Sequence, residues 1–211
     1  AILSVSSQLY GTLLPQALAA NYWQLPRSNV QTLFGQLPIN GLITRGDTGS
    51  RESDQGRRST SFPSVKVKVG DKEPAKDANH LIQIKESSSP FRPGLKLRAD
   101  ANRAWDIDTA QVFSDKLRSA GGVFDAIEFI EEPIKALTVD GTWSFDAQVA
   151  ALETFSNDGG LRYAIDESLV DLAVKYNNDF EMIATELRKA FGGESVGQTS
   201  CAAFVLKPAL L

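Results

Sequence analysis

The stretch VKVKVG at residues 65–70 opens a series of five short apolar runs, each of which leads into a charged residue. About 31 to 41 residues separate the successive charged ends, which is roughly the length of one strand–helix unit. Because a parallel barrel places the carboxyl end of every strand on one face, these charged residues should meet in one pocket. The other four runs are LKLRADAN (95–102), AIEFIEEP (126–133), LRYAIDES (161–168) and AAFVLKP (202–208).

The segments between these runs have the three-and-four spacing of helices. Helical patterns follow Pro74, follow Asp106 or Asp108 as a cap, and cover residues 145–155 and 180–191. Strands that alternate with helices predict an α/β fold with a parallel sheet, here a partial (β/α) TIM-type barrel with about six of the eight strands. The predicted strands are 39–44, 65–69, 95–100, 126–131, 161–166 and 202–207, of which 39–44 has the weakest pattern.

The predicted organisation is a short helical region at residues 1–38, followed by the incomplete barrel at 39–211 with a polar loop at 45–64. The start of the sequence has neither an initiator methionine nor a basic leader, and the sequence stops four residues after Lys207. We therefore expect a fragment of a longer polypeptide.

The composition excludes several classes of partner. A net charge of −4 and a pI near 5.1 argue against nucleic acid, because phosphate binding needs clustered basic charge. No run approaches the ~20 apolar residues that cross a bilayer, so we expect no membrane segment. A zinc site is improbable because His80 and Cys201 are the only soft ligands and lie in no ligand-spaced cluster.

Each charged residue of the series also has an ordinary explanation when it is taken alone. Lys66 and Lys68 suit a strand with one face in water, and Asp100 suits a helix cap or a turn. Three strand-end carboxylates in successive units, with lysines at both ends of the series, make independent coincidence the weaker interpretation. Carboxylate oxygens match the preference of Mg²⁺, with Mn²⁺ as an alternative, so the sequence predicts a divalent-metal site.

In order and spacing, the motifs VKVKVG, LRADANRAW, FIEEP, AIDESL and FVLKPALL resemble the enolase superfamily and, within it, the o-succinylbenzoate synthases. The sequence is also similar to the synthase module of plant multifunctional phylloquinone-biosynthesis proteins. This resemblance implies that residues 1–38 are a remnant of the N-terminal capping domain. It also implies a chloroplast location, with the cytoplasm as the expectation otherwise. The implied partners are a small carboxylate substrate and further modules of a longer multifunctional chain.

The resemblance implies a role for each charged residue. Mg²⁺ would be ligated by Asp100, Glu131 and Asp166. Lys68, the second lysine of VKVKVG, would be the acid–base residue, and Lys207 would lie on the opposite face of the substrate.

The resemblance further implies that Lys66 and Asn102 orient or tune this set. The implied reaction is dehydration of 2-succinyl-6-hydroxy-2,4-cyclohexadiene-1-carboxylate to o-succinylbenzoate, a step toward phylloquinone or menaquinone. Two alternatives stay open. One is an N-acylamino acid racemase or dipeptide epimerase that uses Lys68 and Lys207 as opposed bases, and the other is a truncated remnant without catalytic activity.

Overall fold

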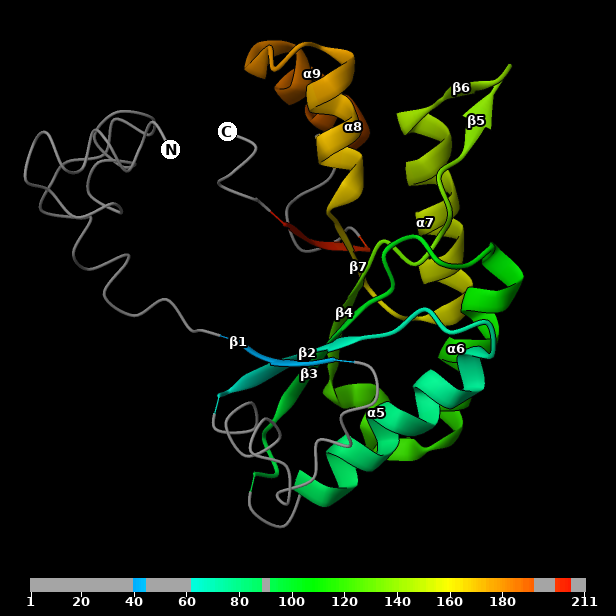
Figure 1. Ribbon diagram of the computed structural model, residues 1–211, viewed down its shortest axis with the longest axis vertical. Coiled ribbons are helices and arrows are strands. Elements are labelled where there is room, and N and C mark those ends of the chain that lie inside the picture. The colour runs from blue at the N-terminus through cyan, green and yellow to red at the C-terminus, as the bar shows by residue number, and fades with distance from the viewer. Residues whose placement is uncertain (1–39, 45–61, 89–91, 192–199, 206–211) are drawn as a thin grey trace, which may run out of the picture. The chain divides into compact units, whose positions relative to one another are not determined.

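The computed structural model describes residues 40–44, 62–88, 92–191 and 200–205 (Figure 1). Within them, six strands form one parallel sheet in which neighbours in sequence are neighbours in space. The predicted α/β fold is confirmed, and the arrangement is that of a partial TIM-type barrel. The strands are β1 (Asn40–Ile43), β2 (Ser64–Lys68), β3 (Lys96–Asp100), β4 (Ile127–Glu131), β7 (Tyr163–Ile165) and β8 (Cys201–Phe204).

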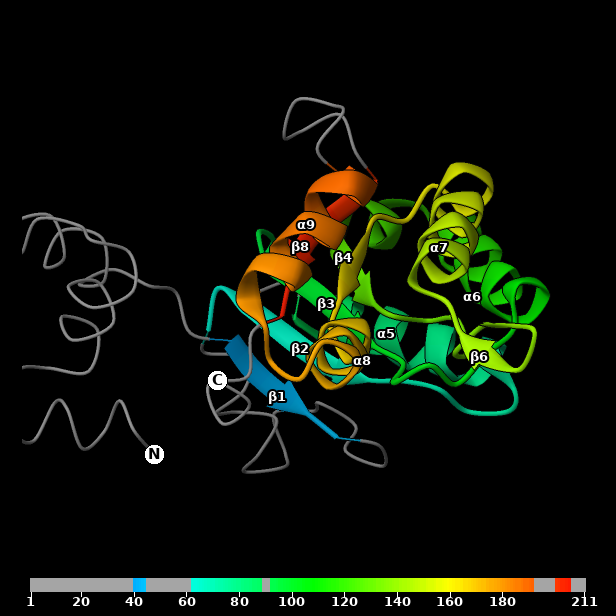
Figure 2. The ribbon, with the colours of Figure 1, turned by 90° about the horizontal axis from the view of Figure 1, so that it is seen from above.

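The helices of the described residues lie in the connections between these strands. Figure 2 shows α5, α6 and α7 outside the curve of the sheet, whereas α8 and α9 lie beyond the end of β7. None of the helices in the described ranges is long and apolar enough to cross a membrane. Their bounds are α5 (Pro74–Ser88), α6 (Ile107–Ser119), the 3₁₀ helix η1 (Gly121–Ala126), α7 (Phe145–Gly159), α8 (Glu167–Lys175) and α9 (Phe180–Phe191).

The core lies between the strands and the outer helices. In β2 the valines Val65 and Val67 are fully buried, whereas Lys66 and Lys68 alternate with them and lie on the opposite face. The helices contribute their apolar stripes to the same core, because residues three and four apart share one side of a helix. The fully buried helical side chains include Leu81, Phe113, Leu117, Leu152 and Phe155.

Capping residues fix where the helices begin and end. Asp106, one of the two predicted caps, accepts a hydrogen bond of 2.9 Å from the Thr109 N–H at the start of α6. Ser144 caps α7 in the same way, and Gly160 ends that helix in the left-handed conformation, with φ of 69°. Capping residues next to the helices therefore set the start of α6 and both ends of α7.

Helix α8, the 3₁₀ helix η1 and one short hairpin were not predicted. Helix α8 begins directly after Asp166, and a short hairpin of β5 (Thr138–Val139) and β6 (Thr142–Trp143) precedes α7. The predicted helix at 180–191 exists as α9, but none of its residues is buried. The helical region predicted at 1–38 lies outside the described residues, and so does Lys207. Of the predicted polar loop at 45–64, only the last three residues are described, and the last of them, Ser64, belongs to β2.

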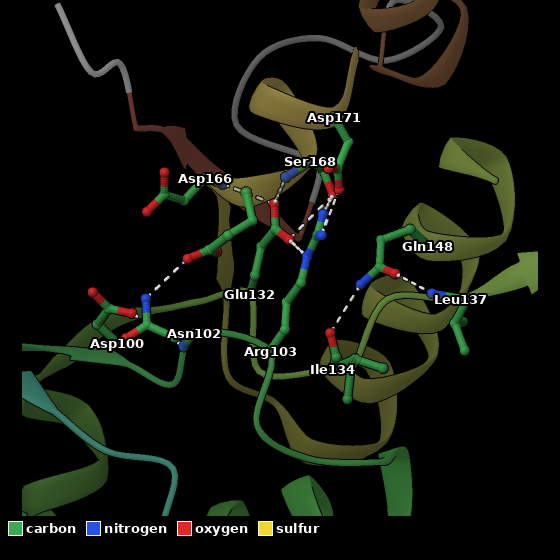
Figure 3. Close-up of polar contacts among 11 residues, drawn as sticks. Asp100, Asn102, Arg103, Glu132, Ile134, Leu137, Gln148, Asp166, Ser168 and Asp171 are labelled. Carbon is green, nitrogen blue, oxygen red and sulfur yellow. Dashed lines mark hydrogen bonds and ion pairs between the residues drawn. The ribbon is translucent and has the colours of Figure 1, made fainter. Parts of the chain in front are cut away.

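The fully buried Gln148 of α7 holds the segment that follows β4. Its Nε2 group donates to the Ile134 carbonyl at 3.0 Å, and its Oε1 atom accepts the Leu137 N–H at 3.0 Å (Figure 3). One side chain thus satisfies two backbone groups in the loop between β4 and the hairpin.

We expect Gln148→Leu to lower the free energy of unfolding by about 2 kcal/mol, because it leaves a carbonyl and an N–H group without a partner. Urea unfolding followed by circular dichroism measures this change. Gln83→Leu, on the exposed side of α5, is the control and should change stability by less than about 0.5 kcal/mol. Equal effects of the two substitutions would contradict the assigned role of Gln148.

Candidate active site

The carboxyl ends of β2, β3, β4 and β7 lie next to one another at one edge of the sheet. The register pairs Lys68 with Asp100, Asp100 with Glu131, and Glu131 with Ala164. Asp166 follows two residues after Ala164 and therefore projects from the same face. Strand register brings four of the predicted site residues to this edge, namely Lys66, Lys68, Asp100 and Glu131, and Asp166 follows the end of β7.

Lysine and carboxylate side chains form a continuous network at this edge. The Lys66 Nζ atom lies 2.7 Å from Asp100 Oδ2 and 2.5 Å from Glu131 Oε2. The Lys68 Nζ atom lies 2.5 Å from the same Asp100 oxygen and donates to Asn102 Oδ1 at 2.9 Å. Asp100 is fully buried, whereas the Lys68 side chain is 34% exposed and that of Lys66 is 22% exposed, so Lys68 is the more accessible of the two lysines.

The charges of this network shift the pKa values of its members in opposite directions. Burial alone lowers the pKa of Lys66, but hydrogen bonds to Asp100 and Glu131 outweigh burial and raise it. Burial alone raises the pKa of Asp100, but the two lysines lower it overall. The pKa of Glu131 is raised, first by burial and then by the charges of Asp100 and Asp166, despite its bond to Lys66.

Asp166 lies at the end of β7 and is 1% exposed. Its N–H donates to Glu132 Oε1 at 2.8 Å, while its carboxylate extends away from Glu132, on the side where Asp100 lies (Figure 3). The charge of Asp166 also acts on the pKa of Glu131. Asp166 therefore lies close enough to Glu131 for their charges to interact, and its role as a metal ligand stays a prediction.

The three carboxylates suit a divalent cation in their chemistry. They are hard oxygen donors on adjacent strand ends, and the charges of Asp100 and Asp166 already disfavour ionised Glu131, which a cation would relieve. Among the residues with described positions, however, no three acidic, histidine or cysteine side chains converge closely enough to form a ready-made metal site. The Lys66 ammonium group instead bridges Asp100 and Glu131.

Beside this network lies a second polar cluster that the sequence analysis missed. Arg103 contacts Glu132 through Nε at 2.5 Å, Asp171 through one terminal nitrogen at 2.5 Å, and Ser168 through the other at 2.7 Å (Figure 3). Three of its members, Arg103, Glu132 and Ser168, stand in the motifs ANR, EEP and DES, within three residues of a predicted ligand, and Asp171 follows in α8. The cluster will be called the Glu132 cluster, and its members are Arg103, Glu132, Ser168 and Asp171.

Comparison with known proteins identifies the family of this chain. Residues 50–174 match the family described as Enolase C-terminal domain-like. A chloromuconate cycloisomerase from Pseudomonas putida is 33% identical over 144 residues, which are 65% of this chain and 33% of that protein. The chain spans about a third of the length of the curated relatives it matches.

Two solved structures align with most of the chain. An o-succinylbenzoate synthase from Thermosynechococcus elongatus BP-1, complexed with Mg in the active site, is 24% identical with a TM-score of 0.49, covering 90% of this chain and 63% of that one. A mandelate racemase/muconate lactonizing protein from Herpetosiphon aurantiacus is 16% identical with a TM-score of 0.50, covering 73% and 45%.

The matched segment covers more than half of the chain. It contains Lys66, Lys68 and the three strand-end carboxylates, so the family assignment and the site rest on the same residues. The chain therefore belongs to the enolase superfamily, through its Enolase C-terminal domain-like region.

Proposed function

We propose that this protein is a divalent-metal-dependent lyase that dehydrates 2-succinyl-6-hydroxy-2,4-cyclohexadiene-1-carboxylate to o-succinylbenzoate. The observation that carries this proposal is the network in which Lys66 and Lys68 meet Asp100 and Glu131 at the carboxyl ends of the strands. The resemblance of the motifs around these residues to the o-succinylbenzoate synthases supports the choice of substrate. The product places the reaction in phylloquinone or menaquinone biosynthesis.

The reaction begins with removal of a weakly acidic proton next to a carboxylate, so the enediolate must be stabilised while it forms. Superfamily sites use a lysine or histidine base together with Mg²⁺ for this purpose. In this chain Asp100, Glu131 and Asp166 would hold the cation. When bound, Mg²⁺ supplies Lewis-acid stabilisation of the carboxylate oxygens of the substrate.

The structure favours Lys68 over Lys66 as the acid–base residue. Lys66 lies between two carboxylates that raise its pKa, so it remains a cation at neutral pH and contributes charge. Lys68 is the more exposed amine, and Asp100 and Asn102 fix its Nζ atom. Asn102 is oriented in turn, because its Nδ2 group donates to Glu167 at 2.9 Å.

In the proposed reaction, Lys68 accepts the α-proton and then donates it to the departing hydroxide on the same side of the ring. Water is released, and aromatisation of the ring drives the step forward. Lys207 would stabilise the anionic intermediate from the opposite face by its charge.

A second candidate is a cycloisomerase, because a chloromuconate cycloisomerase shares 33% identity with the chain. Both candidates would use the same lysine and carboxylates and would differ in the groups that surround the rest of the substrate. Racemisation or epimerisation remains the third alternative, with Lys68 and Lys207 as opposed bases. Assays of all three substrate classes with Mg²⁺, with solvent deuterium exchange at the α-carbon, distinguish them.

We expect Mg²⁺ to raise the melting temperature of the protein and a chelator to reverse this change. A cation at 100 times its dissociation constant adds about 2.7 kcal/mol to the free energy of unfolding if it binds only the folded state. Differential scanning fluorimetry with Mg²⁺ and EDTA measures the shift, and Asp166→Asn should reduce it. A cooperative transition that is indifferent to Mg²⁺ would contradict the proposed metal-dependent function and favour a non-catalytic remnant.

A further inference from the structure

The side-chain amide of Asn102, just after β3, joins two residues from other parts of the chain. Its Oδ1 atom accepts a hydrogen bond from the Lys68 Nζ atom at 2.9 Å. Its Nδ2 group donates to Glu167 Oε1, also at 2.9 Å (Figure 3). Asn102 therefore connects Lys68, the last residue of β2, with Glu167, the first residue of α8.

The orientation of this amide is set by both of its partners. An ammonium group only donates hydrogen bonds, so the amide oxygen must face Lys68. An ionised carboxylate only accepts them, so the amide nitrogen must face Glu167. In the described part of the chain, Glu167 is the only acceptor that contacts Nδ2. Without Glu167, the amide is free to rotate away from Lys68.

The backbone of Asn102 is fixed separately from its side chain. Its φ of 48° lies in the left-handed region, which asparagine enters more readily than most residues. Its N–H donates to Asp100 Oδ1 at 3.2 Å, which holds the backbone next to the site. The freedom that remains is rotation of the side chain, and this is what the contact with Glu167 removes.

Glu167 is a poor choice for stability alone. Its Oε2 atom is buried and has no hydrogen-bond partner among the described residues. A buried acceptor without a partner costs stability, so its presence in a folded protein needs an explanation. Departures of this kind are expected at functional positions. The contact of the other oxygen, Oε1, with Asn102 gives Glu167 such a position.

Lys68 needs support because it is the more exposed lysine of the network. Its side chain is 34% exposed, compared with 22% for Lys66. A lysine side chain has many rotamers, and a group that transfers a proton must be held within hydrogen-bond reach of the reacting atom. Asp100 contacts the Lys68 Nζ atom, and Asn102 provides the second contact that defines its position.

We propose that Glu167 is a positioning residue for Lys68, which it holds in place by orienting the Asn102 amide. This inference rests on the proposed function, in which Lys68 transfers the proton. Glu167 acts through Asn102 and does not need to touch the substrate. Its loss should therefore slow the chemical step and leave substrate binding unchanged.

The test measures the turnover number and KM of Glu167→Leu and Glu167→Gln for 2-succinyl-6-hydroxy-2,4-cyclohexadiene-1-carboxylate at saturating Mg²⁺. Leucine accepts no hydrogen bond. Glu167→Leu should lower turnover by about 10- to 100-fold, since a misplacement of a reacting group by about 1 Å can cost about 100-fold. KM should stay within about twofold of the parental value, because only the chemical step is affected.

Two further variants identify the cause of this loss. Glutamine keeps an acceptor oxygen without the charge, so Glu167→Gln should keep turnover within about threefold of the parent. Glu181 is the matched control, because it also lies in the first turn of a helix, α9, and its side chain is 93% exposed. Glu181→Leu should change turnover by less than about twofold, as expected for a surface position.

A double-mutant cycle separates positioning through Asn102 from a general structural role. Asn102→Gly removes the amide, and glycine adopts a φ of 48° without strain. It should lower turnover at least as much as Glu167→Leu does. If Glu167 acts only through Asn102, adding Glu167→Leu to Asn102→Gly should lower turnover no further. A structural role of Glu167 would instead give losses that add.

The Asn102 amide also gives a readout that needs neither metal nor turnover. In a proton–nitrogen correlation spectrum, its Nδ2 signals are identified by their absence from Asn102→Gly. The signal of the proton bonded to Glu167 should move upfield in Glu167→Leu and stay near its parental position in Glu167→Gln. Glu181→Leu should leave the Nδ2 signals unchanged.

The inference is overturned if the Nδ2 signals of Glu167→Leu match those of the parent, or if Glu167→Leu or Asn102→Gly keeps the parental turnover. It is also overturned if the losses in the cycle add, or if Glu167→Gln is as impaired as Glu167→Leu. A parent protein without dehydratase activity would contradict the proposed function itself, and the positioning of Lys68 for it. The Nδ2 signals would then still show whether Glu167 orients Asn102.

Discussion

Lys68→Met should lower the turnover number for o-succinylbenzoate formation by about 10²- to 10⁴-fold, the contribution typical of a positioned acid–base group. Lys68 is the more exposed lysine of the network, with a third of its side chain exposed, and Asp100 and Asn102 hold its Nζ atom. Methionine has a similar length but accepts no proton. Steady-state kinetics with saturating Mg²⁺ measures the loss.

Lys96→Met is the control for this substitution. Lys96 begins the neighbouring strand β3, and its Nζ atom donates to the Asp125 carbonyl at 3.2 Å, at the opposite end of the sheet. It should leave turnover within about twofold of the parent. If Lys68→Met retains more than a tenth of the parental turnover while Mg²⁺ still binds, another residue must be the base.

The fold was largely predictable because each element carries its own signal. In β2, valines and lysines alternate, and the lysines face the site while the valines enter the core. Asp106 stands directly before a helical stripe and caps α6 as expected. Parallel pairing then follows from the strand–helix alternation, and it brings Asp100 and Glu131 side by side without any further information.

The missed features depend on contacts between segments that are distant in sequence. Helix α8 starts one residue after β7, with only the bend residue Asp166 between them, and the side chain that caps it comes from Glu132 rather than from Asp166. Glu131 and Glu132 are neighbours in the sequence. The structure separates their roles, since Glu131 contacts Lys66 in the site, whereas Glu132 contacts Arg103 behind it.

The sequence analysis predicted a complete metal site, whereas the described carboxylates do not converge closely enough to form one. It counted carboxylates at strand ends, which is correct for Asp100, Glu131 and Asp166. It did not predict that Lys66 would bridge two of them at 2.5 and 2.7 Å. Because Lys66 lies between two predicted ligands, it sets the position of their carboxylate oxygens. Residue spacing alone does not predict such a contact. The predicted role of Lys207 stays a prediction.

Asp100→Asn should both abolish the stabilisation by Mg²⁺ and weaken the fold by about 1–3 kcal/mol. Asp100 is fully buried and is the shared anion of Lys66 and Lys68, so its neutralisation leaves two cations with Glu131 as the nearest compensating charge. Breaking a fully buried ion pair costs about 3–5 kcal/mol. We expect less here because the lysine side chains are 22% and 34% exposed, and solvent screens them.

The pH dependence of this loss identifies its cause. The lysines lower the pKa of Asp100 in the folded protein, against the effect of burial, so the charge of Asp100 stabilises the fold above its ordinary pKa of 3.8. That stabilisation disappears as the pH falls through the lowered value. The stability difference between the parent and Asp100→Asn should therefore be largest near pH 7 and shrink below pH 3.8, as measured by urea unfolding across this range.

Asp108→Asn, on the exposed side of α6, is the control and should show no such dependence. A difference for Asp100→Asn that is as large at pH 3 as at pH 7 would mean that packing, and not charge, makes Asp100 important. The network of two lysines around one buried carboxylate would then lose its role as the electrostatic centre of the site. Only a metal-binding measurement could then support Asp100 as a ligand.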